Sequence, residues 1–291
     1  MPIDLVSLAN VIISGILTGL VYGLMALGLS VIFGVARVVN FAHGELMALA
    51  MYLSVVLFGA WNLDPFTIVL PMAMLFFVLG YLLQAKIIHP FITRPEHAQF
   101  MLLLAIAVIL TNALLIVFGP DARSVRLDYL LESIEFGPLL LDRGKLYAAS
   151  VASAAAIGLF AFFRFTRTGT AIRACADNWF GAQVVGLNIR WLYAIAFGLG
   201  AACVAVAGCM TILLVDLTPA LGPAYTLLAF VIVIVGGLGS MNGALLGGVL
   251  IGVSEALAGL FITPSAKSMV SFALLSIVLL FRPRGLLGNK F

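Results

Sequence analysis

The segment 40–45, which reads Asn-Phe-Ala-His-Gly-Glu, places polar side chains between two long apolar runs. In one interpretation Asn40 caps the helix that follows, and Glu45 then stabilises the positive N-terminal end of that helix. In the other, Asn40, His43, Gly44 and Glu45 belong to a broken helix whose unwound backbone lines a gate or a solute path, as discontinuous helices do in transporters. The sequence leaves both interpretations open.

Two further signals lie inside apolar sequence. Glu255 stands well inside an apolar run, where a carboxylate is costly and is expected to face the protein interior or a cavity. Pairing with a helix of a second subunit explains it as well as contact with a solute does. A turn-forming cluster also interrupts the run 225–261. Its candidates for a gate or path are Gly236, Gly237, Gly239 and Ser240.

The stretch 164–190 reads as a soluble insert between apolar runs. It carries four arginines, at 164, 167, 173 and 190, against the single acid Asp177. Small and apolar residues recur in it at three- and four-residue steps, which predicts a short helix with one apolar face. These residues are Ile172, Cys175, Ala176, Trp179, Ala182, Val185 and Gly186. The stretch is either a basic loop that lies on the bilayer or a docking helix for a cytoplasmic protein.

No catalytic motif accompanies these residues. The pair Gly144-Lys145 is followed by Leu146 rather than Ser or Thr, so the chain has no phosphate-binding loop. The zincin and nucleophile-elbow motifs are missing, and the three cysteines have no metal or redox spacing. We therefore expect no enzyme activity and no cofactor, and a pore or transporter remains.

The composition places these residues in a membrane. Hydrophobic residues make up 64% of the chain and charged residues 9%, with a mean hydropathy of +1.22, whereas soluble domains are about 25% charged. The net charge of +3 is small and its basic residues are scattered, which argues against nucleic-acid binding. The first four residues lack the basic region of a cleavable signal, so the first apolar run is kept as a span.

Nine apolar runs predict an all-α polytopic membrane protein with a single transmembrane domain over residues 1–291. Eight runs are full segments that can cross about 30 Å of hydrocarbon, and the one near 226–238 is short; broken or re-entrant stretches interrupt the series. The runs are roughly 8–34, 44–60, 66–86, 98–119, 145–163, 191–215, 226–238, 243–261 and 266–282. Glycines spaced about four residues apart, at 15, 19 and 23 and again from 243 to 252, predict close helix packing rather than a binding site.

The positions of Lys and Arg predict the orientation, because these residues are enriched in cytoplasmic loops. With 164–190 inside, the loop 84–97 and the C-terminus are also cytoplasmic, while the N-terminus and the stretch 216–223 are outside. The outer loop 120–144 then contains both basic and acidic residues, a weak violation of the rule, and is expected to form a structured cap. This orientation requires 225–261 to cross the membrane twice.

Four motifs occur along the chain in a fixed order. They are Gly19-Leu-Val-Tyr-Gly-Leu-Met-Ala-Leu-Gly-Leu, Val39-Asn-Phe-Ala-His-Gly-Glu45, Arg173-Ala-Cys-Ala-Asp177 with Gly186-Leu-Asn188, and Gly236-Gly-Leu-Gly-Ser240 with Gly243-Ala244. This series resembles the permease subunits of branched-chain amino acid ABC importers, and the H-type subunit in particular. The resemblance covers about residues 8–285, and the combination of the second and fourth motifs is highly specific.

The resemblance implies a five-part importer of the bacterial cytoplasmic (inner) membrane. The other parts are a second, M-type permease, two cytoplasmic ATPases that bind the ATP and Mg²⁺, and an extracytoplasmic solute-binding protein. It also implies a short cytoplasmic coupling helix that sits in a cleft of the ATPase. The positions that match this helix are Arg173, Ala174, Cys175, Ala176, Asp177 and Gly186. The general Glu-Ala-Ala-x-x-x-Gly pattern is not reproduced, since no Glu precedes Ala176, and Arg173 and Asp177 have instead the spacing of a helical ion pair.

The resemblance implies leucine, isoleucine or valine as cargo. A path walled by aliphatic side chains suits these solutes, because a cationic or highly polar solute would find too few partners to replace its hydration. Relatives of such importers carry urea, short amides or aromatic acids, which are alternative cargoes. A secondary transporter is another alternative, but an ion or proton relay would need several intramembrane charges, and a passive channel is a third.

Overall fold

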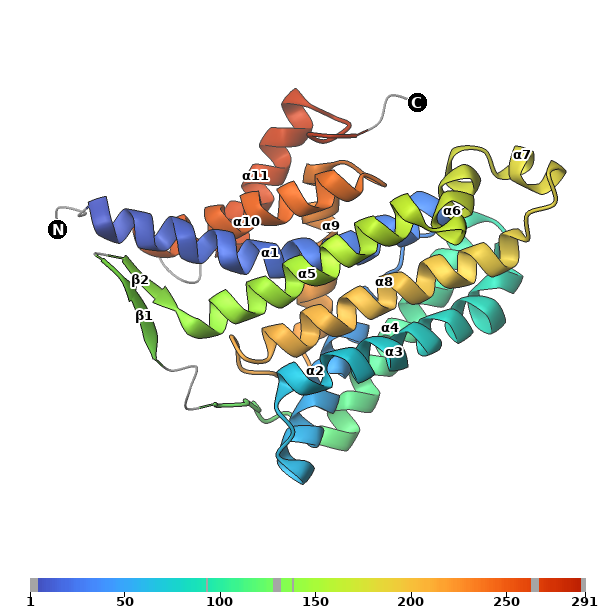
Figure 1. The fold of residues 1–291 in the computed structure, drawn as a ribbon. Helices are drawn as coiled ribbons and strands as arrows, with labels where there is room; N and C mark the ends of the chain where they lie inside the picture. Colours follow the sequence, from blue (N-terminus) through green and yellow to red (C-terminus); the bar gives the residue numbers. More distant parts are fainter. Residues whose placement is uncertain (1–4, 93, 128–131, 138, 263–266, 289–291) are drawn as a thin grey trace.

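The computed structural model of the chain describes residues 5–92, 94–127, 132–137, 139–262 and 267–288. It is a bundle of helices with one small β-hairpin (Figure 1). The helices are α1 (Leu5–Ala36), α2 (His43–Trp61), α3 (Pro65–Leu82), η1 (Leu83–Ile88), η2 (His89–Phe91), α4 (Glu96–Phe118), α5 (Arg143–Phe165), α6 (Arg167–Asp177), α7 (Trp179–Val184), α8 (Ile189–Thr211), α9 (Leu221–Gly236), α10 (Met241–Phe261) and α11 (Lys267–Phe281), and the strands are β1 (Ser133–Phe136) and β2 (Leu139–Asp142).

The long helices set the two ends of the molecule. Helices α1, α5 and α8 pack against one another, with the hairpin at one end and α6 and α7 at the other (Figure 1). Because an α-helix rises about 1.5 Å per residue, the 23 residues of α8 are enough to cross the hydrocarbon core. The basic insert and the hairpin of the loop 120–144 are therefore separated by the length of these helices.

Each of the nine expected segments coincides with a helix. In the described part of the chain, seven helices are long and apolar enough to cross a membrane, counting α3, η1 and η2 as one span from Pro65 to Phe91. The two remaining helices, α9 and α11, are shorter apolar helices. The structure thus shows a polytopic helical protein with seven candidate spans, and the number of crossings in the region 221–281 stays a prediction.

Helix α8 is the centre of the bundle. It packs against α1, α2, α3 and α5, and 78% of its apolar window is buried, compared with 17% for α4. Helix α4 therefore lies at the periphery, where Met101, Ile109 and Ile116 are exposed. Exposed apolar area of this extent on a membrane protein faces lipid or another subunit.

Helices α1 and α10 meet along a seam of glycines. A Cβ atom at Gly19 would lie 2.7 Å from the Cα of Val249, and one at Gly15 would lie 2.8 Å from the Cα of Val253. The pairing runs in opposite directions along the two helices, since Gly23 meets Leu245. Only glycine permits this approach of two backbones, so the prediction of close packing at these glycines is confirmed.

The described part of the loop 120–144 is folded. Strands β1 and β2 pair antiparallel, with Ser133 opposite Asp142, and β2 packs against the start of α1. The Leu140 N–H donates to the Asn10 Oδ1 at 3.1 Å, and Arg143 forms an ion pair with Glu132. The expectation of a structured cap is confirmed for these residues; residues 128–131 and 138, and the first four residues of the chain, lie outside the described part.

Candidate functional site

The connection between α1 and α2 is a buried, non-helical stretch. Asn40 is fully buried, and its Oδ1 accepts a hydrogen bond of 3.1 Å from the Ala42 N–H. Ala42, not Asn40, occupies the N-cap position of α2. The prediction that Asn40 caps α2 is therefore wrong: its side chain instead stabilises the turn two residues ahead, which is a common use of asparagine.

His43 fixes α2 against α1. Its side chain is fully buried, and its Nε2 lies 2.9 Å from the Met25 carbonyl oxygen. A carbonyl can only accept, so the proton of the neutral ring is on Nε2. The Nδ1 then has a lone pair and no hydrogen-bond partner among the described residues.

Glu45 and Thr226 join the first turn of α2 to α9. The Thr226 hydroxyl donates to the Glu45 Oε2 at 2.8 Å and accepts from the Gly44 N–H at 2.8 Å. A side chain at Gly44 would collide with the Gly222 carbonyl oxygen and the Thr226 backbone. Glu45 thus lies in the first turn of α2, as expected, but sequence reasoning missed Thr226, since nothing local marks a threonine 181 residues away as its partner.

A hollow of about 350 Å³ opens beside this network, between α2, α4 and α9. Its walls are mostly apolar, and its polar groups come from Glu45, Thr226, Thr111 and Asn112. Asn40 and His43 are not among its lining residues. Of the four candidates in segment 40–45, the structure therefore places the side chain of Glu45 at a hollow and buries the other two polar side chains in helix contacts.

The turn 236–240 lies at the other end of α9 from Thr226. Gly237 and Gly239 have positive φ angles of 112° and 77°, which side chains rarely adopt, and Ser240 caps α10 by accepting from the Gly243 N–H at 3.1 Å. Ten residues of helix separate Thr226 from Gly236, about 15 Å at the usual rise. The structure therefore does not bring the two motifs together in one site.

The C-terminal segment seals this turn. The Leu286 N–H donates to the Val235 carbonyl and the Leu287 N–H to the Gly236 carbonyl, both at 2.9 Å. These are carbonyls of the last turn of α9, which have no partner within the helix. Gly285 packs directly against Gly237, so the glycine cluster is held from two sides.

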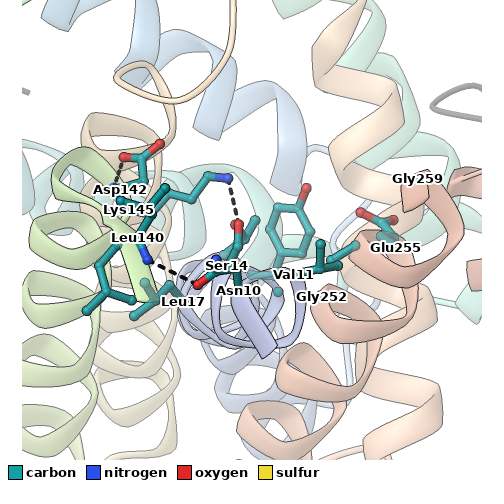
Figure 2. A pocket seen from close by; sticks show the side chains of 15 residues that line it. Asn10, Val11, Ser14, Leu17, Leu140, Asp142, Lys145, Gly252, Glu255 and Gly259 are labelled. Carbon is teal, nitrogen blue, oxygen red and sulfur yellow. Dashed lines mark hydrogen bonds between the residues drawn. The ribbon is translucent and has the colours of Figure 1, made fainter. Parts of the chain in front are cut away.

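Glu255 faces a cavity of about 440 Å³ between α1, α10 and the start of α5. Its Oε1 accepts from the Ser271 hydroxyl of α11 at 2.8 Å. Across the cavity the Lys145 Nζ donates to the Ser14 Oγ at 2.7 Å, and Figure 2 shows the α1 side chains lying between the lysine and the glutamate. The prediction that Glu255 faces a cavity is confirmed.

The basic insert folds into α6 and α7. Ile172, Cys175 and Ala182 are buried, and α6 packs against α5, α8 and α1. Of the seven residues predicted to share one apolar face, these three are thus covered by the chain itself and do not form an exposed surface. Trp179 and Val185, predicted for the same face, are exposed. Asn178 caps α7, accepting from the Gly181 N–H at 2.8 Å, and α7 is followed by Gly186, whose φ is 85°.

The insert also has an exposed apolar surface, on α7 and the residue that follows it. Trp179, Phe180, Val184 and Val185 are 55%, 64%, 72% and 75% exposed. Sequence reasoning did not single out Phe180 or Val184, although two adjacent aromatic residues in a polar loop are a signal of contact with another surface. Arg173, Ala174 and Asp177 are exposed beside them, and in the described part of the chain no ion pair joins Arg173 to Asp177.

Cys175 is a buried thiol below this surface. Burial raises the pKa of Cys175, and a hydrogen bond with Tyr193 opposes that rise without cancelling it. A thiol with a raised pKa carries little thiolate at neutral pH and reacts slowly. Cys175 is therefore a packing residue of α6.

Seven candidate spans, buried polar breaks at helix ends and a folded connection at one end are the features of a polytopic membrane protein. The sequence model of a family described as the permease component of branched-chain amino acid transport systems matches residues 11–279. The chain belongs to this family.

Three relatives illustrate the similarity. The chain is 28% identical to the LivH proteins of Salmonella typhimurium and Escherichia coli K12, over 95% of this chain and 94% of each relative. It is 28% identical to BraD of Pseudomonas aeruginosa, over 96% of this chain and 95% of the relative. All three are named high-affinity branched-chain amino acid transport system permease proteins. No solved structure matches the chain significantly.

Proposed function

We propose that this chain is the H-type permease subunit of an ATP-driven importer for branched-chain, hydrophobic neutral amino acids. The observation that carries the proposal is the family match over residues 11–279, together with relatives of that name that align over nearly their whole length. The chain forms the translocation path with a second, homologous permease. Two cytoplasmic ATPases bind and hydrolyse the ATP, and an extracytoplasmic binding protein delivers the solute.

The polar network at Glu45 supports a gate in this path. The hollow beside it has mostly apolar walls, which can hold an aliphatic side chain without removing hydrogen bonds from it. Glu45 lies at its edge with one carboxylate oxygen on Thr226, and it offers the other to the ammonium group of a solute. His43 and Gly44 hold α2 at this point, and Asn40 holds the turn before it.

The turn 236–240 and Glu255 have separate parts in the proposed path. Closing and opening would bend the bundle where α9 ends, because Gly237 and Gly239 are the positions there whose backbone lies outside the usual range. Glu255, at the hairpin end, belongs to the region that receives the solute. Its bond to Ser271 connects α10 with α11, so it also supports the assembly of these helices.

The exposed face of α6 and α7 is the proposed docking surface for an ATPase. Four large apolar side chains gather on it, next to Arg173, Ala174 and Asp177. An exposed apolar cluster surrounded by charged residues is typical of a protein interface. We assign the docking to Trp179, Phe180, Val184 and Val185, with Ala176 and Gly186 shaping the turns and Cys175 supporting the surface from below.

In the proposed arrangement residues 1–291 form one permease domain that crosses a bacterial inner membrane nine times. The N-terminus and the hairpin lie outside, and α6, α7 and the C-terminus lie inside. The basic residues of the insert support this orientation. It places docking and hairpin surfaces on opposite sides, as coupling to ATP inside and solute delivery from outside require.

The test is uptake of labelled leucine into proteoliposomes. With all five components and ATP inside, we expect uptake that isoleucine and valine compete and that urea and short amides do not. The chain alone should carry nothing, since half of the path and all of the ATP chemistry lie in other subunits. Leucine uptake by the lone chain, or uptake of urea, an amide or an aromatic acid but not leucine by the complete set, contradicts the assignment.

A further inference from the structure

A cavity of about 740 Å³ lies between the α6–α7 insert and the ends of three spans. Arg37 follows the end of α1, His89 lies near the end of the span Pro65–Phe91, and Arg190 lies at the start of α8; all three line the cavity. We call it the basic cavity. Trp179 and Gln183 of α7 close it on the side of the insert.

The charged residues known to line the basic cavity have one sign. Among the described residues, its lining contains two arginines and a histidine and no aspartate or glutamate. The Arg190 Nη2 donates to the Ala85 carbonyl at 3.1 Å, which uses one of the five donors of a guanidinium. The His89 Nδ1 is buried without a hydrogen-bond partner among the described residues. These groups are suited to an anion with several oxygen atoms.

The backbone at Arg37 is unusual. Its φ is 52°, and among the described residues only Asn62 is another non-glycine residue with a positive φ. Such a conformation is rare for a residue with a side chain and persists only where the surroundings impose it. It ends α1 at the basic cavity, which keeps Arg37 beside Arg190 and His89 rather than one turn further along a continued helix.

The depth of the cavity indicates where the anion comes from. Three spans end at Ala36 and Phe91 or begin at Ile189, and in the proposed orientation these ends are on the cytoplasmic side, toward the lipid headgroups. Trp179 and Tyr193 line it, and these residue types favour that level. The neighbouring turns expose Leu82 and Ile87, which can contact acyl chains.

We propose that the basic cavity binds the phosphate of an anionic phospholipid of the cytoplasmic leaflet. Arg37 and Arg190 pair with the phosphate oxygens, and His89 donates from Nδ1 to the phosphate or the headgroup. Basic pockets between spans at the cytoplasmic surface bind anionic lipids in this way. A transported neutral amino acid fits less well, because none of the described lining residues offers a carboxylate to its ammonium group.

The bound lipid would connect α7 to the ends of three spans. The insert is otherwise held mainly through α6, which packs against α5, α8 and α1. A lipid that bridges Trp179 on one side and Arg190 on the other therefore stiffens the link between the insert and the bundle. The inference uses the proposed orientation but not the identity of the cargo.

The test counts lipids that stay with the purified importer complex. The complex is reconstituted in nanodiscs of phosphatidylcholine with one quarter phosphatidylglycerol, extracted into detergent, washed and analysed by mass spectrometry. Wild type should retain phosphatidylglycerol in preference to phosphatidylcholine. Arg37→Gln with Arg190→Gln should lower this retention roughly twenty-five-fold, since each arginine contributes a factor of about five. Arg190→Lys, which keeps the charge, should retain most of it.

The controls separate this result from misfolding and from a soluble anion. Arg167→Gln removes an exposed arginine of α6 that does not line the cavity and should retain lipid as wild type does. Equal retention in the double variant and in wild type overturns the proposal. Displacement of phosphatidylglycerol by millimolar inorganic phosphate overturns the lipid source, because it identifies a site for a soluble phosphate. Lipid retention does not depend on which solute is carried, so this test holds even if the proposed cargo is wrong.

Discussion

At the scale of single residues, Gly44 shows how the polar network is built. Its N–H donates to Thr226, and its missing side chain lets α2 approach the Gly222 carbonyl. Two backbones that touch cannot separate locally without moving their helices, so the position tolerates no Cβ. Gly59 lies in the same helix with open space around it, which makes it a matched control.

We expect Gly44→Ala to lower the free energy of unfolding of the purified chain by about 3 kcal/mol or more, and with it the thermal midpoint, because the strain of overpacking here falls on backbone atoms. Gly59→Ala should be neutral or slightly stabilising, since alanine favours helix by about 1 kcal/mol. Melting followed by tryptophan fluorescence measures both. Equal midpoints for the two variants would show that α2 and α9 can move apart at no cost.

A second prediction at this scale concerns Cys175. Because burial raises the pKa of its thiol, the thiolate fraction at pH 7 is below that of an exposed cysteine. In a background without Cys203 and Cys209, we expect maleimide to label Cys175 at least about tenfold more slowly than Ala174→Cys in a Cys175→Ser chain. Labelling of Cys175 should still rise with pH where the exposed control has levelled off. Equal rates at pH 7 would mean that α6 detaches readily from the bundle.

At the scale of elements, α7 carries the proposed docking surface. Phe180→Asp should leave the protein inserted but weaken its hold on the ATPase at least tenfold, because the aromatic ring would no longer be buried at the interface. Phe180→Leu keeps an apolar contact and should cost little. Ala176→Trp, a bulky change on half-buried Ala176, should also lower coupling. The measurements are co-purification of the ATPase and solute-stimulated ATP hydrolysis. Normal values of both for Phe180→Asp would show that the ATPase does not dock on α7.

The elements were mostly predictable from sequence, because their signals are local. Apolar runs placed the helices, the cluster at 236–240 separated α9 from α10, and glycine spacing indicated the seam of α1 and α10. Which side of the insert packs against the bundle was not predictable. Ile172, Cys175 and Ala182 form an apolar face, but only the packing of α6 on the bundle shows that this face is already covered.

The candidate site was predictable in part for the same reason. Segment 40–45 could be recognised because it places polar residues in apolar sequence. Glu255 could be recognised because it is a carboxylate within an apolar run. The hydrogen-bond partners of His43, Glu45 and Glu255 could not be predicted from the sequence. These partners, Met25, Thr226 and Ser271, lie on other helices and have no distinguishing pattern around them. The basic cavity was missed because its arginines are far apart in the chain and meet only after α1 and α8 have packed.

At the scale of the whole molecule, the proposed orientation predicts which cysteines an impermeant reagent reaches in intact cells. In a cysteine-free background, Glu135→Cys in the hairpin should be labelled from outside. Val184→Cys on α7 and Leu287→Cys should be labelled only after the membrane is permeabilised. All three positions are exposed on the isolated chain, so accessibility alone does not decide the result. External labelling of Leu287→Cys would exclude nine crossings with the insert inside.

The hydrogen bonds between the C-terminal segment and the end of α9 have a consequence for how the protein is synthesised and inserted. The ribosome produces residues 285–287 only after α10 and α11, yet these residues supply the hydrogen bonds that complete the end of α9. Until these residues have been made, the carbonyls of Val235 and Gly236 lack these hydrogen bonds, and a buried carbonyl without a partner is costly. Helices α9 to α11 are therefore expected to leave the translocon as a group, with their final packing reached after the last of them has been inserted.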